Sequence, residues 1–322
     1  MAKTEVTVIM PGMAAIVAQA INRDAIPPYL TKLIDKSRLI PNETGLSRCM
    51  FNHFSQTPLV GSDLPMMGIS SETDITSEQA QGFTIKADPC YLHPDRDRLL
   101  LFSKGLDLTD QESVELIAEV QPLLYDLGVL SLQSADSWTL TLAQQPNIDF
   151  SALDAVEGKM VESNLPSGED RRQWLTLWNE IQMQLYNADV NTRRVDNKQL
   201  PINSLWFWGQ GTFEPMQDNW TNITGQSPLL AQLVDKTGQG SQYAPNDITP
   251  RFSRASKGRH LHLLEELNTE LDWQTQLQYL DTNVFEPLWR QLSKMAINKL
   301  VLQVPEFGEY HLTPLSRWRF WT

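Results

Sequence analysis

The sequence predicts an α/β protein in which a mostly parallel sheet is flanked by helices and carries an inserted small α+β subdomain. Three observations predict this class. The β-branched run Glu5 to Met10 is followed by Pro11-Gly12 and then by a helical pattern, the order expected in a parallel sheet. A block from Gly82 to Gln144 has the pattern of two strands, a helix and two strands. After this block, strands and helices alternate to the end of the sequence.

The region before this block is expected to hold the first strand, two helices and a long loop. Met13 to Ile21 has helical spacing. Pro28 suits the first turn of a second helix, because the amide hydrogen that proline lacks is unsatisfied there. The stretch from Pro41 to Gln81 is rich in Ser, Thr, Gly and Pro, which predicts a loop with at most one short helix. Long loops in compact domains often carry function, so this stretch is a candidate location for a site.

The inserted block, 82–144, is expected to form a sheet of its own. FTIKA and RLLLF have the composition of strands, and GVLSLQ with WTLTLA has the pattern of a hairpin. Thr109 precedes a helical run with Glu112 three residues later, which is the pattern of a capping box. We therefore predict an α/β core formed by 1–81 and 145–322, interrupted by an α+β subdomain at 82–144.

The rest of the core is predicted from periodicity. Ser167 is the expected cap of a long helix over 169–187, and residues at helical spacing give that helix one apolar face. The residues of that face are Trp174, Leu177, Trp178, Ile181 and Leu185. The remaining elements are strands in INSLWFWG and at 260–264, 299–304 and 309–312, and helices at 227–236 and 273–296.

Composition excludes several classes of function. The chain has 322 residues, 41% of them hydrophobic, which is enough to bury a substantial core. With 26 Lys and Arg against 39 Asp and Glu, its net charge is −13, and such a surface repels nucleic-acid backbones and anionic lipid. We therefore expect neither nucleic acid nor a membrane as a partner. The two cysteines, Cys49 and Cys90, form no CxxC pair and suit a reducing compartment.

The sequence also predicts a cytoplasmic location. Its apolar start, from Val6 to Ile21, is broken by Pro11-Gly12, where the core of a signal sequence would be continuous. No stretch of the sequence reaches the length of a membrane-spanning helix.

An acidic segment is the first candidate site. ADPCYLHPDRDR places Asp88, His93, Asp95 and Asp97 within ten residues, and carboxylates with an imidazole are ligands for a divalent cation. The alternative is a loop in which the neighbouring arginines pair with the aspartates. This alternative is favoured, because the turn glycine and the distal glutamate of a calcium loop are missing.

A basic segment is the second candidate site. RFSRASKGRH brings Arg251, Arg254 and Arg259 together in an otherwise acidic chain. Guanidinium groups suit phosphate or carboxylate, although most such runs are solvated surface. The three arginines are therefore candidate contacts for a small anionic metabolite.

Aromatic and amide side chains suggest a ligand-binding cleft between the main sheet and the subdomain. Trp206 and Trp208 share one face of a strand that ends in GQG, where glycines allow a close approach of the backbone. The candidate residues near this cleft are Asp88, Gln182, Asn203 and Trp208. Aromatic core and a buried amide with a structural partner are the alternatives. His260 and His262 alternate on a strand, where histidines with structural partners are commoner than metal ligands.

Several strings together resemble one bacterial family. ADPCYLHPDRDRLLLF, WNEIQMQLYNADVN, PINSLWFWGQG and the ending LTPLSRWRFW are similar to the RpfE-type regulatory proteins, which are related to cofactor-independent phosphoglycerate mutase. The resemblance covers most of the chain. It implies the alkaline-phosphatase-like fold with an inserted subdomain.

The mutases of that superfamily imply a role for one serine. VGSDLPMMG resembles the GSD segment that carries their nucleophile, whose counterpart here is Ser62, and NSLWFWGQG resembles their Trp-Gly-Gln-Gly segment. The metal ligands differ. Those enzymes have Asp-Gly after the first strand, where this chain has Pro11-Gly12, and HLHLLEELN and LVLQVPEFG lack the later ligand pairs.

The resemblance therefore implies a regulatory or binding protein that has lost the two-metal phosphotransfer site. Without those metals Ser62 would stay protonated and weakly nucleophilic. In this hypothesis the chain uses no cofactor and binds a small anionic metabolite or a partner protein. A third hypothesis is a purely interacting protein, whose partner surface is the C-terminus with Trp318 and Trp321.

The alternative is an active phosphoglycerate mutase-like phosphotransferase. It would use Ser62 as the nucleophile with an atypical set of ligands for Mn²⁺ or Zn²⁺. That set is Asp63, Asp88, His93 and His262.

Overall fold

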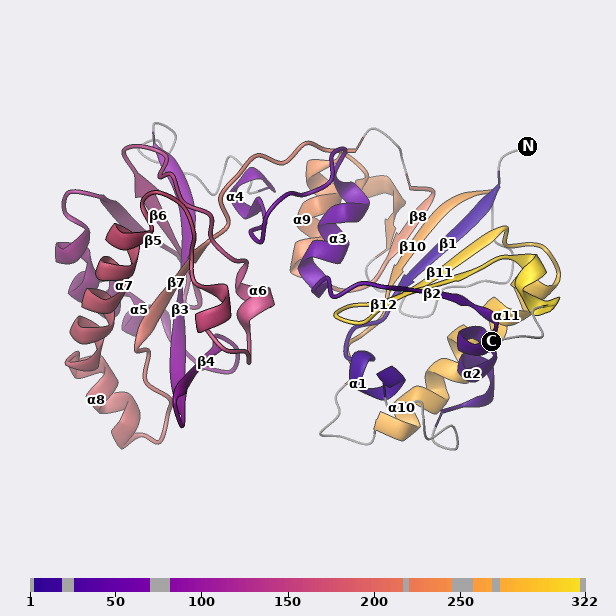
Figure 1. Cartoon of the computed structure of the whole chain (residues 1–322), viewed down its shortest axis with the longest axis horizontal. Coiled ribbons are helices and arrows are strands. Elements are labelled where there is room, and N and C mark those ends of the chain that lie inside the picture. Colours follow the sequence, from indigo (N-terminus) through magenta and orange to yellow (C-terminus); the bar gives the residue numbers. More distant parts are fainter. Residues whose placement is uncertain are drawn as a thin grey trace. The chain divides into compact units, whose positions relative to one another are not determined.

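The structure is a computed structural model that describes residues 3–18, 26–69, 82–216, 220–244, 257–267 and 273–318. The chain forms two compact units, each with its own sheet (Figure 1). The discontinuous unit combines Met1–Gln56 with Pro215–Thr322, and the inserted unit is Thr57–Glu214. Within the described residues, no helix is long and apolar enough to cross a membrane.

The discontinuous unit is built on a seven-stranded sheet of order β2-β12-β11-β1-β10-β8-β9. The strands from β11 to β9 pair in parallel, and β12 and β2 are added antiparallel at one edge. The strands are β1 (Thr4–Ile9), β2 (Arg38–Pro41), β8 (Asn222–Thr224), β9 (Tyr243–Ala244), β10 (Gly258–Leu263), β11 (Lys299–Val304) and β12 (Gly308–Leu312). The helices are α1 (Ala14–Ala18), α2 (Pro28–Lys36), α3 (Leu46–Phe54), α9 (Pro228–Lys236), α10 (Trp273–Leu280) and α11 (Glu286–Ser293). A mostly parallel sheet flanked by helices confirms the predicted α/β class.

The core of this unit lies between one face of the sheet and helices α2, α10 and α11. Val6 and Val8 of β1 and Leu300 and Leu302 of β11 alternate onto that face and are buried in one apolar cluster. Figure 1 shows α3 and α9 on the opposite side of the sheet. Helices therefore cover both faces, which explains why the central strands β1, β10 and β11 are largely buried on both faces.

The inserted unit has a five-stranded sheet in which the long strand β3 joins three neighbours. β3 pairs antiparallel with β6, β7 and β4 in turn along its length. The strands are β3 (Phe83–Asp95), β4 (Arg98–Phe102), β5 (Gly128–Ser134), β6 (Ser137–Leu142) and β7 (Ser204–Trp208). The helices are α4 (Met66–Ile69), α5 (Asp110–Val120), α6 (Leu153–Val156), α7 (Arg171–Tyr186) and α8 (Asp189–Asp196). The short 3₁₀ turns of the chain are Gln121–Leu124, Glu162–Asn164, Gly240–Gln242 and Pro314–Trp318.

The inserted unit extends well beyond the expected subdomain, 82–144. Strand β7 pairs with β3, and α7 packs on β7, so residues after 144 complete the sheet that begins at Phe83. The Asp63 carboxylate also accepts hydrogen bonds from the amides of Gly209 and Gln210. The sequence shows each strand but not its pairing partner, and the unit's boundaries depend on that pairing.

Three predicted helix features are wrong. The stretch from Pro41 to Gln81, expected to be a loop with at most one short helix, contains both α3 and α4 in its described part. Ser167 does not cap the long helix: α7 begins at Arg171, and Ser167 instead forms a short β-bridge with Asp149. The single helix expected at 273–296 is divided into α10 and α11 by the π-helical turn Asp281–Phe285. Pro287, at the start of α11, has no amide hydrogen to donate back into the preceding turn, which favours this break.

The π-helical turn carries the cap of another helix. The buried Asp281 carboxylate accepts the amide hydrogens of Tyr29 at 3.2 Å and Leu30 at 2.7 Å, at the start of α2. We expect Asp281→Ala to lower the free energy of unfolding by about 1–2 kcal/mol, because both amides lose their acceptor. Asp281→Asn keeps one acceptor oxygen and should lose less. Equal losses in urea unfolding of the two variants would contradict this role.

Candidate functional site

Ser62, the predicted nucleophile, lies in the inserted unit and is bonded to the segment around Phe150. Its Oγ donates to the carbonyl oxygen of Phe150 at 2.9 Å and accepts from the Oγ of Ser151 at 3.3 Å. Its carbonyl oxygen accepts the amide of Ala152 at 3.1 Å. The side chain and the backbone of Ser62 therefore hold two loops together.

Asp63 connects the same region to the residues that follow β7. Its carboxylate accepts the amides of Gly209 at 2.8 Å and Gln210 at 3.0 Å, and its Oδ1 also accepts the amide of Leu64. Gly209 has φ +84°, a conformation that favours glycine, and a Cβ there would lie 2.8 Å from Cγ of Lys86. The glycine that follows β7 thus lets the amides turn toward Asp63.

Gln210 adds a further hydrogen bond to this region, but its side-chain oxygen has no hydrogen-bond partner among the described residues. Its Nε2 donates to the carbonyl oxygen of Ile148 at 2.5 Å. Within the described residues, Oε1 of Gln210 is the buried side-chain polar atom without a hydrogen-bond partner. It is an acceptor that a water or a ligand donor can satisfy.

Asp88 and Trp208, two of the predicted ligand-binding residues, contact each other. Asp88 lies on β3 with a side chain that is buried, and its Oδ2 accepts Nε1 of Trp208 at 2.7 Å. Its Oδ1 accepts the amide of Trp138 at 2.9 Å. Burial raises the pKa of Asp88, while nearby Lys86 and these hydrogen bonds oppose that shift. Both carboxylate oxygens therefore hold strands β6 and β7 to β3.

The other two predicted cleft residues also make hydrogen bonds to backbone. Asn203 accepts the amide of Leu92 at 2.7 Å and donates to its carbonyl oxygen at 3.0 Å, which mimics one more residue of strand pairing. Gln182 donates to the carbonyl oxygen of Trp178, one turn earlier in α7.

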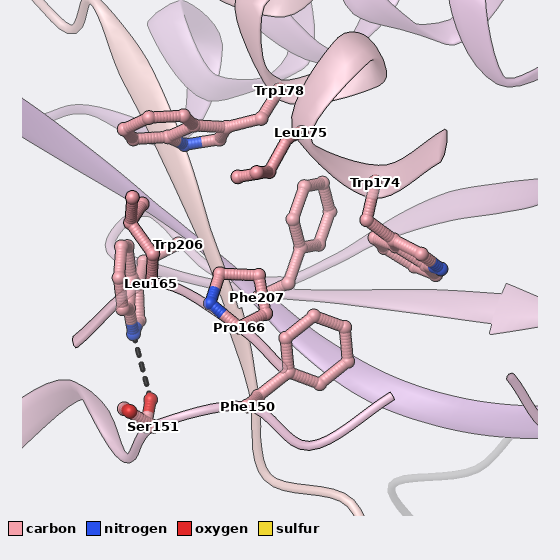
Figure 2. A pocket seen from close by; sticks show the side chains of 9 residues that line it. All are labelled: Phe150, Ser151, Leu165, Pro166, Trp174, Leu175, Trp178, Trp206 and Phe207. Atoms are coloured by element: carbon pink, nitrogen blue, oxygen red, sulfur yellow. Dashed lines mark hydrogen bonds between the residues drawn. The ribbon is translucent and has the colours of Figure 1, made fainter. Parts of the chain in front are cut away.

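An aromatic pocket lies beside Ser62, between α7, β7 and the loop at Phe150. Figure 2 shows its side chains turned toward a common space, with Nε1 of Trp206 donating to the carbonyl oxygen of Ser151 at 2.8 Å. The lining residues are Phe150, Ser151, Leu165, Pro166, Trp174, Leu175, Trp178, Trp206 and Phe207. The cavity measures about 20 Å³, which is room for little more than one water molecule. In this conformation the aromatic side chains pack mainly against one another.

Of the three predicted anion contacts, Arg259 lies in the described part of the discontinuous unit, and Arg251 and Arg254 lie outside it. The Arg259 guanidinium is 4.1 Å from the ring centre of Trp220, the distance of a cation–π contact. It also donates to Sδ of Met216 at 3.6 Å. Arg259 is thus a half-buried cation on β10 that packs on the ring of Trp220. The predicted partner residues Trp318 and Trp321 have side chains outside the described residues.

A row of polar side chains on α3, β11 and β12 was not predicted. Nε2 of His53 lies 2.7 Å from Oε1 of Gln303, whose Nε2 donates to Glu309 at 3.0 Å. Glu309 is 2.8 Å from Nε2 of His311. Burial lowers the pKa of His53. The i, i+2 spacing of Glu309 and His311 was the one sequence signal for this row, because the other members are distant in sequence.

The four residues of the alternative metal set occupy separate surroundings. Asp63 and Asp88 bind the amides described above, and the exposed His93 contacts the hydroxyl of Tyr91. His262 belongs to the discontinuous unit, where its Nδ1 is 2.7 Å from Oγ1 of Thr224. Across the ranges that the structure describes, no group of three or more His, Cys, Asp or Glu side chains is placed to hold a metal ion.

His262 makes stability depend on pH. Burial first, and the neighbouring His260 second, lower its pKa to about 3 in the folded chain. The unfolded chain takes up this proton near its ordinary pKa of about 6.5, so protons favour unfolding and stability falls as pH drops from about 6.5 toward 3. Between pH 7 and pH 5 the loss attributable to His262 is expected to be about 2 kcal/mol.

Urea unfolding at both pH values tests this expectation. The variant His262→Gln should lose less stability than the wild type on acidification, whereas the exposed control His93→Gln should behave as the wild type. An unchanged pH dependence in His262→Gln would show that this histidine does not carry the effect.

Comparison with known proteins finds partial similarity to one class of enzyme. No family model matches the sequence. The "Probable 2,3-bisphosphoglycerate-independent phosphoglycerate mutase" of Geobacter sulfurreducens is 34% identical over 80 residues, or 25% of this chain and 20% of that protein. The enzyme of that class from Methanosarcina mazei is 28% identical over 93 residues, or 29% of this chain and 23% of its own length. The matched segment thus spans about a fifth of these relatives.

Two solved structures are also similar over most of the chain. The cofactor-independent phosphoglycerate mutase from Thermoplasma acidophilum has a TM-score of 0.40 and 12% identity, with 97% of this chain and 89% of that chain covered. A protein of Pyrococcus horikoshii has a TM-score of 0.44 and 11% identity, with 97% and 88% covered. The sequence matches support the expected relation to cofactor-independent phosphoglycerate mutases; the RpfE-type resemblance stays a prediction.

Proposed function

We propose that this chain is a cytoplasmic regulatory or binding protein of the RpfE type, built on a phosphoglycerate-mutase-like scaffold that no longer transfers phosphoryl groups. The observation that carries the proposal is that Ser62 and Asp63 use their side chains for hydrogen bonds that hold neighbouring loops together. The Ser62 hydroxyl donates a hydrogen bond to the backbone carbonyl oxygen of Phe150. The Asp63 carboxylate accepts hydrogen bonds from the amides of Gly209 and Gln210.

A serine nucleophile needs a base or a metal that takes its proton. Ser62 instead has the Phe150 carbonyl and the Ser151 hydroxyl as its partners, and neither is a base at neutral pH. The other carboxylate of the predicted set, Asp88, is occupied by Trp138 and Trp208. These contacts favour a structural role for the segment that corresponds to the mutase nucleophile.

The ligand that we propose is a small anionic metabolite. Arg259 is the described member of the predicted basic segment, and its half-buried guanidinium over Trp220 is held in a fixed position for an anion. The names of the curated relatives suggest a phosphorylated three-carbon acid as the first compound to try.

Binding of 3-phosphoglycerate, measured by calorimetry on the full chain, tests this assignment. Arg259→Ala should weaken binding about ten- to a hundredfold, because a hydrogen bond to a charged group contributes about 1.5–3 kcal/mol. The control Arg38→Ala removes an exposed cation from the edge strand β2 and should bind as the wild type. Equal binding by wild type and Arg259→Ala would remove Arg259 from the site.

The competing function is a phosphotransferase that uses Ser62 with Mn²⁺ or Zn²⁺. The similarity to phosphoglycerate mutases favours it. Metal-dependent turnover of 3-phosphoglycerate that Ser62→Ala abolishes would establish this function in place of the one proposed.

A further inference from the structure

A groove on the inserted unit is lined by residues other than Ser62, Asp63 and Arg259, on which the proposed function depends. It measures about 630 Å³ and lies between helix α7 and the 3₁₀ turn Gln121–Leu124 with the residues that follow it. Leu123, Leu127 and Leu177 contribute apolar side chains to its lining. A second hollow of about 990 Å³ lies against strand β5 and shares Pro122, Tyr125, Asp126 and Leu127 with the first.

Large side chains that are exposed to solvent border this groove. Tyr125, which lines both hollows, is 88% exposed. On α7, Met183 is 70% exposed and lies about one turn beyond Glu180. Exposed aromatic and methionine side chains around a hollow are typical of protein-binding surfaces.

The charge of the groove indicates the kind of partner. Four carboxylates line the first hollow, and Arg172 is the cation among its lining residues. The carboxylates are Asp126, Glu169, Asp170 and Glu180. Glu169 and Asp170 are hydrogen-bonded to Asn147, whereas Asp126 and Glu180 are exposed and make no ion pair within the described ranges. An opposing positive charge would complement this lining and steer a partner to it.

We propose that this groove docks a short basic segment of a partner protein, in which Lys or Arg residues flank a large apolar residue. The apolar residue of the partner packs on Leu123, Leu127 and Leu177 beside Tyr125. Its cations face Asp126 and Glu180. This interaction goes beyond the proposed anion-binding function and uses different residues, so either can fail without the other.

Selection of random twelve-residue peptides by display on the full-length protein tests the proposal. The selected peptides should carry a net positive charge and a large apolar residue. Synthetic versions, titrated by fluorescence anisotropy, should bind the double variant Asp126→Arg, Glu180→Arg at least about tenfold more weakly than the wild type. Tyr125→Ala should also weaken binding, since an exposed aromatic anchor is lost.

The matched control is Asp196→Arg, which reverses an exposed charge at the end of α8, outside the groove. It should bind the peptides as the wild type does. Peptides without net positive charge, no enrichment at all, or equal binding to the double variant would overturn the proposal. Self-association in sedimentation velocity that the double variant abolishes would also overturn it, because the occupant would then be a second copy of this chain.

Discussion

Arg194→Ala is expected to lower the free energy of unfolding by about 3–5 kcal/mol, because a fully buried side chain and its three hydrogen bonds are lost. The Arg194 side chain has no exposed surface. Its Nη1 donates to Glu112 at 3.0 Å, its Nε donates to the carbonyl oxygen of Leu200 at 2.9 Å, and its Nη2 donates to the carbonyl oxygen of Leu106. Alanine leaves all three acceptors without this donor and opens a cavity where the side chain was.

The neighbouring arginine provides a matched control. Arg193 pairs with Glu115 at the surface, where both side chains are more than a third exposed. Such a pair contributes about 0–1 kcal/mol, so Arg193→Ala should be nearly neutral in urea unfolding. If the two alanine variants lose the same stability, burial of Arg194 is not what makes it important.

Asp88→Ala is expected to lower the free energy of unfolding by about 2–5 kcal/mol, although Asp88 is a predicted ligand-binding residue. The substitution removes the acceptor of the Trp138 amide and of the Trp208 indole, and both donors are buried. An unpaired buried donor costs about 1–3 kcal/mol, and β3 would lose a side-chain link to each of its neighbours β6 and β7.

Asp95→Ala is the control, because Asp95 lies exposed near the end of the same strand. It should change stability by less than about 0.5 kcal/mol. Near-native stability of Asp88→Ala, together with loss of 3-phosphoglycerate binding, would contradict the structural role and return Asp88 to the binding site.

Local signals in the sequence predicted individual elements well. Thr109 and Glu112 form the predicted capping box, with both reciprocal hydrogen bonds present. GVLSLQ and WTLTLA pair as the hairpin of β5 and β6. The buried residues of α7 are four of the five assigned to its apolar face, and Trp178 is partly buried with its Nε1 bonded to the Leu205 carbonyl. Each of these features depends on residues close in sequence.

Features that depend on distant residues were not predicted. Asp88 was expected in an acidic segment, either as a metal ligand or in an ion-paired loop. It lies inside β3 instead, and the three partner strands of β3 all follow it in the sequence, the last at Ser204–Trp208. The π-helical break was missed because its Asp281 is fixed by the start of α2, about 250 residues earlier. Such contacts between distant residues determine whether a carboxylate is buried. Burial in turn decides whether the carboxylate can bind a ligand or only accepts hydrogen bonds from the protein itself.

In the candidate site too, the sequence predicted single residues but not the contacts between distant ones. The sequence identified Ser62 through its resemblance to the mutase segment, but it could not show that the Ser62 hydroxyl is bonded to the Phe150 carbonyl. The row from His53 through Gln303 to Glu309 brings together α3, β11 and β12, and this assembly exists only in the folded chain.

In the function that we propose, the Ser62 segment is structural and transfers no phosphoryl group. One measurement tests it directly: the metal content of the untagged protein by elemental mass spectrometry, with intact-mass analysis after incubation with 3-phosphoglycerate and added Mn²⁺ or Zn²⁺. We expect no stoichiometric metal and no phosphoryl adduct, in the wild type and in Ser62→Ala alike. About two metal ions per chain, with an adduct that Ser62→Ala abolishes, would contradict it.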